Sequence, residues 1–432
     1  MPINPKIRKS SLTWILRILC GGLFIFSGFV KAIDPWGTIF KFDEYLSALG
    51  LPNWPGVVVT AVFGLCAIEF VVGCFLLLGC FRKSCPIVAG IIMCLMVPLS
   101  LWLWIKNPIA ECGCFGDALI ISNQLTFIKN IILSGGIGVL IFYNTKAICL
   151  ITPAFQWLAV VASGLFILIM EIFGYNFQPL LDFRNYPVGT SLYAHDNELN
   201  DDFKYIFVYQ KNGVSQEFSI ENIPEESEGW EFVERRDLNP ETKILDNNTG
   251  LHVFDIESEE DITQNAINNN GKQLIVMIPE IEKVSPSTTW KLNALFDWCS
   301  AHDVTMEGIV AGSKEEIDRW EDLSMASYPI YLSDDTLIKE IVRGNPGIVY
   351  LENNIIIWKT SLYSMDVDQF IKNENSTTIS AYGFDNIGIL RNCSAIYLVF
   401  MAFLIFISFT PKMAKILLDK GLGSKKGIRH HE

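Results

Sequence analysis

Two cysteines separated by one glycine are the residues of this chain best suited to redox chemistry. They lie in the polar sequence Glu111-Cys112-Gly113-Cys114-Phe115-Gly116-Asp117, between two apolar stretches. Glycine lets the backbone turn tightly enough for the two sulfurs to meet, and a strained disulfide is easily reduced. We therefore predict that Cys112 and Cys114 are the catalytic residues and alternate between dithiol and disulfide.

Metal binding by these two cysteines is the weaker alternative. A structural zinc site needs four Cys or His ligands, and all five histidines lie far away in the sequence. We predict no metal site. Most other cysteines lie in apolar stretches, where cysteine behaves as a small hydrophobic residue and needs no chemical role. These are Cys20, Cys66, Cys74, Cys94, Cys149 and Cys393.

Six apolar stretches around the motif are long enough to cross a bilayer. A span needs about 20 mostly apolar residues, because a helix rises about 1.5 Å per residue across about 30 Å of hydrocarbon. The 432 residues are 50% hydrophobic, with a mean hydropathy of +0.31, which is too apolar for a soluble protein of this size. The predicted spans are Leu12–Ile33, Val57–Gly79, Pro86–Ile105, Leu125–Tyr143, Ile148–Phe173 and Asn392–Phe409.

Lysine and arginine in the short segments between spans predict the orientation. If each stretch crosses once, the basic N-terminus, Arg82-Lys83, Lys146 and the C-terminal tail share one side, which is the cytoplasm by the positive-inside rule. We expect an inner-membrane protein with both termini cytoplasmic, and with the Cys112–Cys114 segment in the periplasm, where dithiols oxidise. A cleaved signal peptide is the alternative for the N-terminus, and Arg17 within the apolar run argues against it.

Two of the charged residues within the predicted spans, Lys31 and Glu69, bear on the redox motif. An ionisable residue such as Glu69 near the middle of a membrane helix costs about 2.5 to 3.5 kcal/mol on insertion scales. It must therefore be neutral, paired or directed to a polar cavity. Lys31, near the outer end of the first span, could reach either the interface or an internal acid. A functional carboxylate and a merely packed, protonated one both remain open at this point.

An acidic, water-facing block is inserted before the last span. Positions 174 to 390 hold 38 acidic and 15 basic residues, in a chain of net charge −14, which argues against nucleic-acid binding. Alternating residues around Asn212-Gly213 predict a β-hairpin. The apolar run Leu274–Ile278 predicts a buried strand, and the helix and strand patterns that follow it predict an α/β layer structure.

The succession from Gly271 to Lys359 resembles a thioredoxin-like domain of the membrane-tethered periplasmic type. Asn345-Pro346 falls where that family places its cis-proline. Where the family has Cys-x-x-Cys, this chain reads Pro279–Ser287 without a cysteine, so the resemblance implies the fold but no thiol chemistry. We expect Cys299 to be a buried structural residue.

A second resemblance covers about residues 12 to 145. Ser27-Gly28-Phe29-Val30-Lys31-Ala32-Ile33-Asp34-Pro35, Glu69, Cys112-Gly113-Cys114-Phe115-Gly116 and Asn130 resemble the DoxX and MauE superfamily of four-helix, redox-associated membrane proteins, and the whole chain resembles a Bacteroides-type DoxX-like family. In that superfamily MauE is implicated in disulfide maturation and DoxX in quinone-coupled oxidation. The resemblance implies a quinone as candidate cofactor, with Lys31, Asp34, Glu69 and Asn130 binding it.

The expected fold class is a membrane α-helical bundle plus an extracytoplasmic α/β thioredoxin-like domain that lacks CxxC. The expected domains are a four-helix membrane domain (1–145), a fifth membrane helix (146–173), a β-rich segment (174–260), the thioredoxin-like domain (261–375), a sixth membrane helix (391–410) and a basic cytoplasmic tail (411–432).

Three functions remain as hypotheses. The preferred one is thiol–disulfide exchange at the periplasmic face, coupled to a quinone, with a periplasmic protein or thiol as substrate. The alternative is a non-enzymatic membrane-anchored scaffold whose acidic domain docks an envelope partner. A transporter is the third, because a buried acid can couple transport, yet no broken helices with matching halves are visible.

Overall fold

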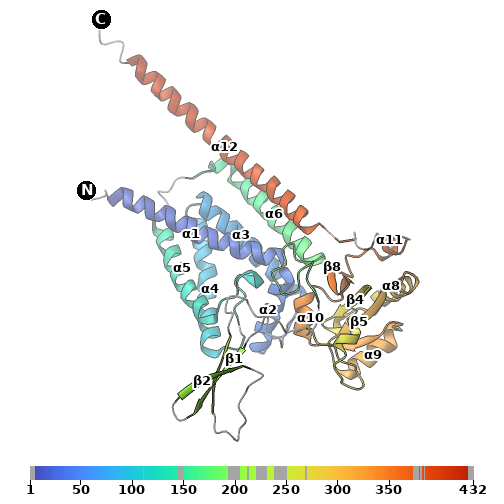
Figure 1. Ribbon diagram of the computed structural model, residues 1–432. Coiled ribbons are helices and arrows are strands. Elements are labelled where there is room, and N and C mark those ends of the chain that lie inside the picture. The colour runs from blue at the N-terminus through green and yellow to red at the C-terminus, as the bar shows by residue number, and fades with distance from the viewer. Residues whose placement is uncertain are drawn as a thin grey trace. The chain divides into compact units, whose positions relative to one another are not determined.

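Figure 1 shows the computed structural model of the chain. The chain forms two compact units. The first comprises Met1–Pro187, Ile341–Ile348 and Lys359–Glu432, and the second Val188–Glu340 and Val349–Trp358. The structure describes residues 5–109, 111–143, 149–192, 205–211, 214–219, 231–237, 251–267, 270–372, 379, 382–383 and 385–426. Within these, side chains of 5–11, 205–211, 214–219, 231–237 and 411–426 are not described.

The first unit is helical. Its long helices are α1 (Pro5–Ile33), α3 (Pro55–Leu78), α4 (Ser84–Lys106), α5 (Asn123–Tyr143), α6 (Gln156–Asn176) and α12 (Asn386–Lys426). Six segments of the described chain, one on each, are long and apolar enough to span a membrane. Large apolar side chains such as Leu95, Ile132 and Phe142 are exposed on them, as expected where lipid replaces water. The protein is therefore a multi-pass membrane protein in contact with the bilayer.

The ends of these helices differ from the sequence predictions in three places. The predicted loop after Asp34 contains a helix, α2 (Pro35–Ala48), because Asp34 accepts a hydrogen bond from Gly37 N and Pro35 suits the first helical turn. The 3₁₀ turn Pro153–Phe155 precedes α6, so Cys149 lies before that helix and the prediction that it lies within a span was wrong. Helix α12 continues to Lys426 through most of the predicted tail. Lys146 lies outside the described residues.

Helices α1 and α3 pack unusually closely. A Cβ on Gly28 would lie 2.6 Å from Phe70 N, and one on Gly73 would lie 2.5 Å from Ile25 N. Only glycine lets the two backbones approach this far, which is a common packing device of membrane helices. The buried Arg17 of α1 secures one end of the pair, since its Nε donates to Leu76 O at 2.8 Å at the carboxyl end of α3.

The second unit contains two sheets. The smaller has the order β2-β1-β3, from Tyr205–Lys211, Val214–Ser219 and Glu231–Asp237, and its antiparallel β1 and β2 form the predicted hairpin. The larger has the order β6-β5-β4-β7-β8. Its strands are β4 (Lys272–Ile278), β5 (Thr305–Val310), β6 (Ile330–Leu332), β7 (Gly347–Glu352) and β8 (Ile355–Ser361). The helices around it are α7 (Thr263–Ala266), α8 (Thr289–Ala301), α9 (Lys314–Ser324) and α10 (Asp335–Ile341), and α11 (Val367–Lys372) follows in the first unit.

The larger sheet has the mixed α/β character that the sequence predicts. Strand β4 lies at its centre and is almost wholly buried, in parallel register with β5, as β5 is with β6. A two-residue turn at Asn353 and Asn354, both at positive φ, joins β7 to β8. The Asn345–Pro346 peptide bond is cis, and Cys299 is buried on α8. The structure thus combines a membrane helical bundle with an α/β domain.

Gly73→Ala should destabilise the helix bundle by about 1 to 3 kcal/mol, because the added methyl group overlaps the α1 backbone. Gly64→Ala is the matched control on the same helix, since a Cβ there meets nothing within 4 Å and alanine favours the helix. Thermal unfolding of both variants in detergent checks this. Equal melting temperatures for the two would contradict the close approach.

Candidate functional site

The Cys112–Cys114 segment lies between α4 and α5 and is folded into a tight turn. Gly113 has a φ of +66°, a left-handed conformation that favours glycine. Gly116 N donates to Gly113 O at 3.1 Å, just before the 3₁₀ turn Gly116–Ala118. The two sulfurs are 2.9 Å apart and are not covalently bonded in this structure. The turn therefore presents two thiols in mutual contact.

Two neighbouring helices hold this turn by its carbonyl groups. The Tyr45 hydroxyl of α2 donates to Cys112 O, and the Ser27 hydroxyl of α1 lies 2.8 Å from Cys114 O. The Phe115 ring packs against Phe26 with 5.4 Å between centroids. Because these anchors on α1 and α2 are far from the turn in the sequence, the position of the thiols depends on the assembled bundle.

A buried ion pair lies on the other side of Ser27. Lys31 Nζ of α1 is 2.6 Å from Glu69 Oε2 of α3, with side-chain exposures of only 5% and 6%. Ser27 Oγ is also 2.8 Å from Glu69 Oε2, so its single hydroxyl proton is shared between the carboxylate and Cys114 O. Removing one charge of such a pair typically costs about 3 to 5 kcal/mol, since the other is left uncompensated.

A small cavity connects these groups. Its volume is about 40 Å³. Asn130 Nδ2 of α5 donates to Ser100 Oγ at 3.1 Å on its border. Four of the predicted site residues therefore line one cavity: Lys31, Glu69, Cys114 and Asn130. Cys112 contacts Cys114. The cavity is lined by Leu23, Phe24, Ser27, Lys31, Glu69, Ile92, Met93, Met96, Cys114, Phe115, Lys129, Asn130 and Leu133.

The two thiols of the turn differ in acidity. A hydrogen bond from the Cys112 thiol lowers the pKa of Cys114 to about 6, against the opposing effect of burial, and Lys129 adds to the lowering. The same hydrogen bond, with burial, raises the pKa of Cys112. Cys114 is partly exposed whereas Cys112 is buried. At neutral pH Cys114 is therefore the thiolate, and the thiolate is the nucleophile in disulfide exchange.

Asp34 does not line the cavity, although the sequence grouped it with the cofactor-binding residues. Its carboxylate accepts from Arg343 Nε at 3.0 Å and from Nη2 at 2.8 Å. Arg343 lies in the segment 341–348 of the first unit and also donates to Asp117 Oδ2 at 2.6 Å. Burial raises the pKa of Asp117, while Arg343 opposes that rise. Asp34 thus helps to tie the residues that follow the two cysteines to the end of α1.

Sequence reasoning missed three residues of this region. Ser27 lies one helical turn before Lys31, and that spacing on a membrane helix was a usable signal. Lys129 received no role from the sequence, yet its Nζ lies 4.2 Å from the Phe115 ring centroid, and it lines the same cavity as Cys114. Glu171 on α6 is fully buried, and neither carboxylate oxygen has a hydrogen-bond partner among the described residues. No three His, Cys, Asp or Glu side chains in the described ranges converge on a metal position.

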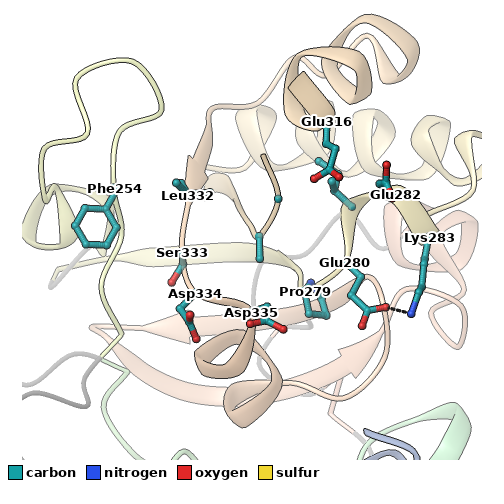
Figure 2. A pocket seen from close by; sticks show the side chains of 13 residues that line it. Phe254, Pro279, Glu280, Glu282, Lys283, Glu316, Leu332, Ser333, Asp334 and Asp335 are labelled. Atoms are coloured by element: carbon teal, nitrogen blue, oxygen red, sulfur yellow. Dashed lines mark ion pairs between the residues drawn. The ribbon is translucent and has the colours of Figure 1, made fainter. Parts of the chain in front are cut away.

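The second unit has a cleft of its own, of about 690 Å³, shown in Figure 2. It lies where three parallel strands end, since Pro279 follows β4, Gly312 follows β5 and Ser333 follows β6. Its polar lining is mostly acidic, and one of these acids, Glu280, pairs with Lys283 at 2.5 Å. The acidic lining residues are Glu280, Glu282, Glu316, Asp334 and Asp335.

Comparison with known families relates the membrane helices to one of them. Residues 9–143 match the family described as methylamine utilisation protein MauE, and this range holds α2 to α5, nearly all of α1 and the Cys112–Cys114 turn. Residues 203–238, which include β1 to β3, match a domain of unknown function (DUF8463). No curated protein matches the chain. The membrane segment formed by α1 to α5 is thus similar to the MauE family, and an α/β domain is present besides it.

Alkylation of Cys114 by iodoacetamide should rise with pH with a midpoint near 6, because the thiolate fraction grows as pH passes the lowered pKa. Cys112→Ala removes the hydrogen bond and should move the midpoint up, toward the ordinary thiol value of about 8.5. Mass spectrometry of the Cys114 peptide, after brief labelling of the protein in lipid nanodiscs, measures both profiles. Identical profiles would show that Cys112 does not activate Cys114.

Proposed function

We propose that this protein is a membrane-bound thiol–disulfide exchange protein in which Cys112 and Cys114 form the redox couple. The main support for this proposal is the 2.9 Å contact between the two sulfurs. The lowered pKa of Cys114, which favours its thiolate form, adds to it. The MauE match over residues 9–143 supports a role in a redox-related membrane pathway. Chemistry of this kind suits a motif whose two sulfurs can form one bond and release it again.

The exchange would proceed in two balanced steps. The Cys114 thiolate attacks one sulfur of a partner disulfide, so that a mixed disulfide forms and the other partner sulfur leaves as a thiolate. The Cys112 thiol then loses its proton and attacks Cys114 Sγ, which releases the second partner thiolate. Both partner sulfurs leave reduced, and Cys112 and Cys114 remain joined. Run backwards, the same steps oxidise a dithiol substrate.

The residues around the cavity would support this exchange electrostatically. Lys129 and Lys31 both lower the pKa of Cys114 by their positive charge. The ion pair of Lys31 with Glu69 keeps the lysine charged in a nonpolar surrounding. In this proposal Asn130 and Ser27 position the cavity wall and the Cys114 carbonyl.

A quinone does not fit the cavity in this structure. A volume of about 40 Å³ is well below the roughly 150 Å³ of a cavity that holds benzene, and a substituted quinone is larger than benzene, even though Lys31, Glu69 and Asn130 carry suitable polar groups. The proposed exchange therefore uses no quinone. A protein dithiol or disulfide, or a small thiol that approaches the partly exposed Cys114, is the substrate class that the proposal names.

We also propose which side of the membrane the termini, the thiols and the acidic unit face. Basic residues at Arg82-Lys83 and in the terminal segments support cytoplasmic termini in an inner membrane. The thiols and the acidic unit would then face the periplasm. A thioredoxin-like relationship for the larger sheet is part of the same proposal, supported by parallel β4, β5 and β6 and a hairpin after Pro346. A DoxX-like ancestry of the helices stays a prediction.

Thiol trapping tests the proposed function. Cells are quenched with acid, and free thiols are labelled with a maleimide that changes gel mobility. We expect a mixture of two species that differ by two labels and that dithiothreitol converts to the fully labelled one. Cys114→Ala should remove the two-label difference that the Cys112–Cys114 pair contributes, while Cys94→Ala on α4 is the matched control and should keep it. A wild-type pair that is always reduced overturns the proposal.

The acidic cleft of the second unit favours a second candidate function, a docking platform. An opening of about 690 Å³ with five carboxylate side chains suits a basic, extended segment of an envelope protein, through complementary charge. In this case the helices are an anchor and the thiols of the turn are dispensable for binding.

A lysine- and arginine-rich peptide tests the platform on the full-length protein in nanodiscs, with an acidic peptide for comparison. Glu282→Gln, in the cleft, should weaken binding several-fold at low salt, whereas the matched change Glu315→Gln, outside the cleft lining, should not. Salt should weaken binding by screening. Equal binding of both peptides, or equal effects of both substitutions, would exclude the cleft as the docking site.

A further inference from the structure

A second pair of cysteines lies at the other end of the helices. Cys80 follows the carboxyl end of α3, and Cys149 lies in the segment that leads to α6. Leu150 N donates to Leu78 O at 3.0 Å, which lays this segment against the end of α3. Cys149 is the neighbour that, after burial, does most to raise the pKa of Cys80, although 69 positions separate the two residues in the sequence.

One buried side chain holds both partners of this pair in place. Gln156, at the start of α6, accepts a hydrogen bond from Phe81 N, next to Cys80, at 3.2 Å. Its amide nitrogen donates to Cys149 Sγ and to Ile151 O, each at 3.2 Å. The Cys149 thiol itself donates to Ile151 O at 2.8 Å. Gln156 is 8% exposed, so the two thiols sit in a defined, shielded arrangement rather than in a loose contact.

We propose that Cys80 and Cys149 form a second dithiol–disulfide couple, which closes a covalent link between the end of α3 and the entry to α6. A small disulfide of the glutathione class is the oxidant. One protein thiolate attacks it and releases a first small thiol, and the second protein thiol displaces the other. Two S–H bonds and one small-molecule S–S bond are lost, one protein S–S bond forms, and the two protons leave on the two small thiols.

The surroundings favour a slow and durable couple. Burial raises the pKa of the Cys80 thiol to about 12, and a poorly acidic thiol is also a poor leaving group in exchange. The buried guanidinium of Arg17 interacts electrostatically with Cys149 and Cys80, which stabilises the thiolate needed during exchange. Cys114, with its lowered pKa, is by contrast a good leaving group that exchanges readily.

The new couple operates independently of the thiols proposed above. Arg17 lies at the carboxyl end of α3, close to Cys80. Lys31 lies beside Cys114, farther along α1. Fourteen residues of helix separate these two positions, a rise of about 21 Å. Direct sulfur-to-sulfur exchange between the two couples is therefore excluded, and either can exist without the other.

Redox titration of the Cys112→Ala/Cys114→Ala double variant in nanodiscs tests the proposal apart from the proposed function. The protein is equilibrated with mixtures of reduced and oxidised glutathione, quenched with acid, denatured and labelled with a polyethylene glycol maleimide. We expect the oxidised sample to carry two fewer labels than the reduced one, with a Cys80–Cys149 cross-linked peptide in the mass spectrum.

Further substitutions in this background separate the pair from its neighbours. Cys149→Ala should abolish the difference in labels, while Cys85→Ala, which removes a nearby buried cysteine of α4, should preserve it. The cross-linked peptide of the double variant decides the question even if Cys149→Ala fails to fold. Equal labelling at every glutathione ratio, or a disulfide that joins Cys80 to Cys85, overturns the proposal.

Discussion

The ion pair between Lys31 and Glu69 is the interaction on which the rest of the membrane unit depends. Neither charge is stable alone in hydrocarbon, so α1 and α3 must meet where the two side chains can reach each other at 2.6 Å. The glycines at the α1–α3 contact allow that approach, and Arg17 secures the pair of helices at the far end. The register of two membrane helices is thus fixed by polar contacts at both ends and by small residues between them.

The reactive turn inherits its position from this helix pair. Ser27 lies within hydrogen-bond distance of both Glu69 and the Cys114 carbonyl, so the ion pair and the thiols share one polar side chain. On the side away from the cavity, Arg343 joins Asp34 to Asp117. The turn is therefore held from two directions, and its short contact between sulfurs is a property of the assembled bundle more than of the three-residue motif.

The two cysteine pairs show how environment separates residues of identical chemistry. Cys114 is partly exposed and lies near two lysines, which with the Cys112 hydrogen bond gives an acidic thiol. Cys80 is fully buried and its pKa is raised to about 12. The first environment suits rapid exchange with a partner, and the second suits slow exchange. Their separation along α1 keeps the two kinds of chemistry apart.

The sequence by itself determined the six membrane spans, the first hairpin and the α/β pattern, because these follow from local periodicity and hydrophobicity. It also singled out Cys112, Cys114, Lys31 and Glu69, since charges and a Cys-Gly-Cys motif stand out in an apolar chain, and the family resemblance added Asn130. Only the tertiary structure decided that Asp34 pairs with Arg343, that Ser27 links the ion pair to the thiols, and that Cys149 meets Cys80. Those contacts join residues 42 to 309 positions apart, and nothing in a local pattern encodes which distant partner a side chain will reach.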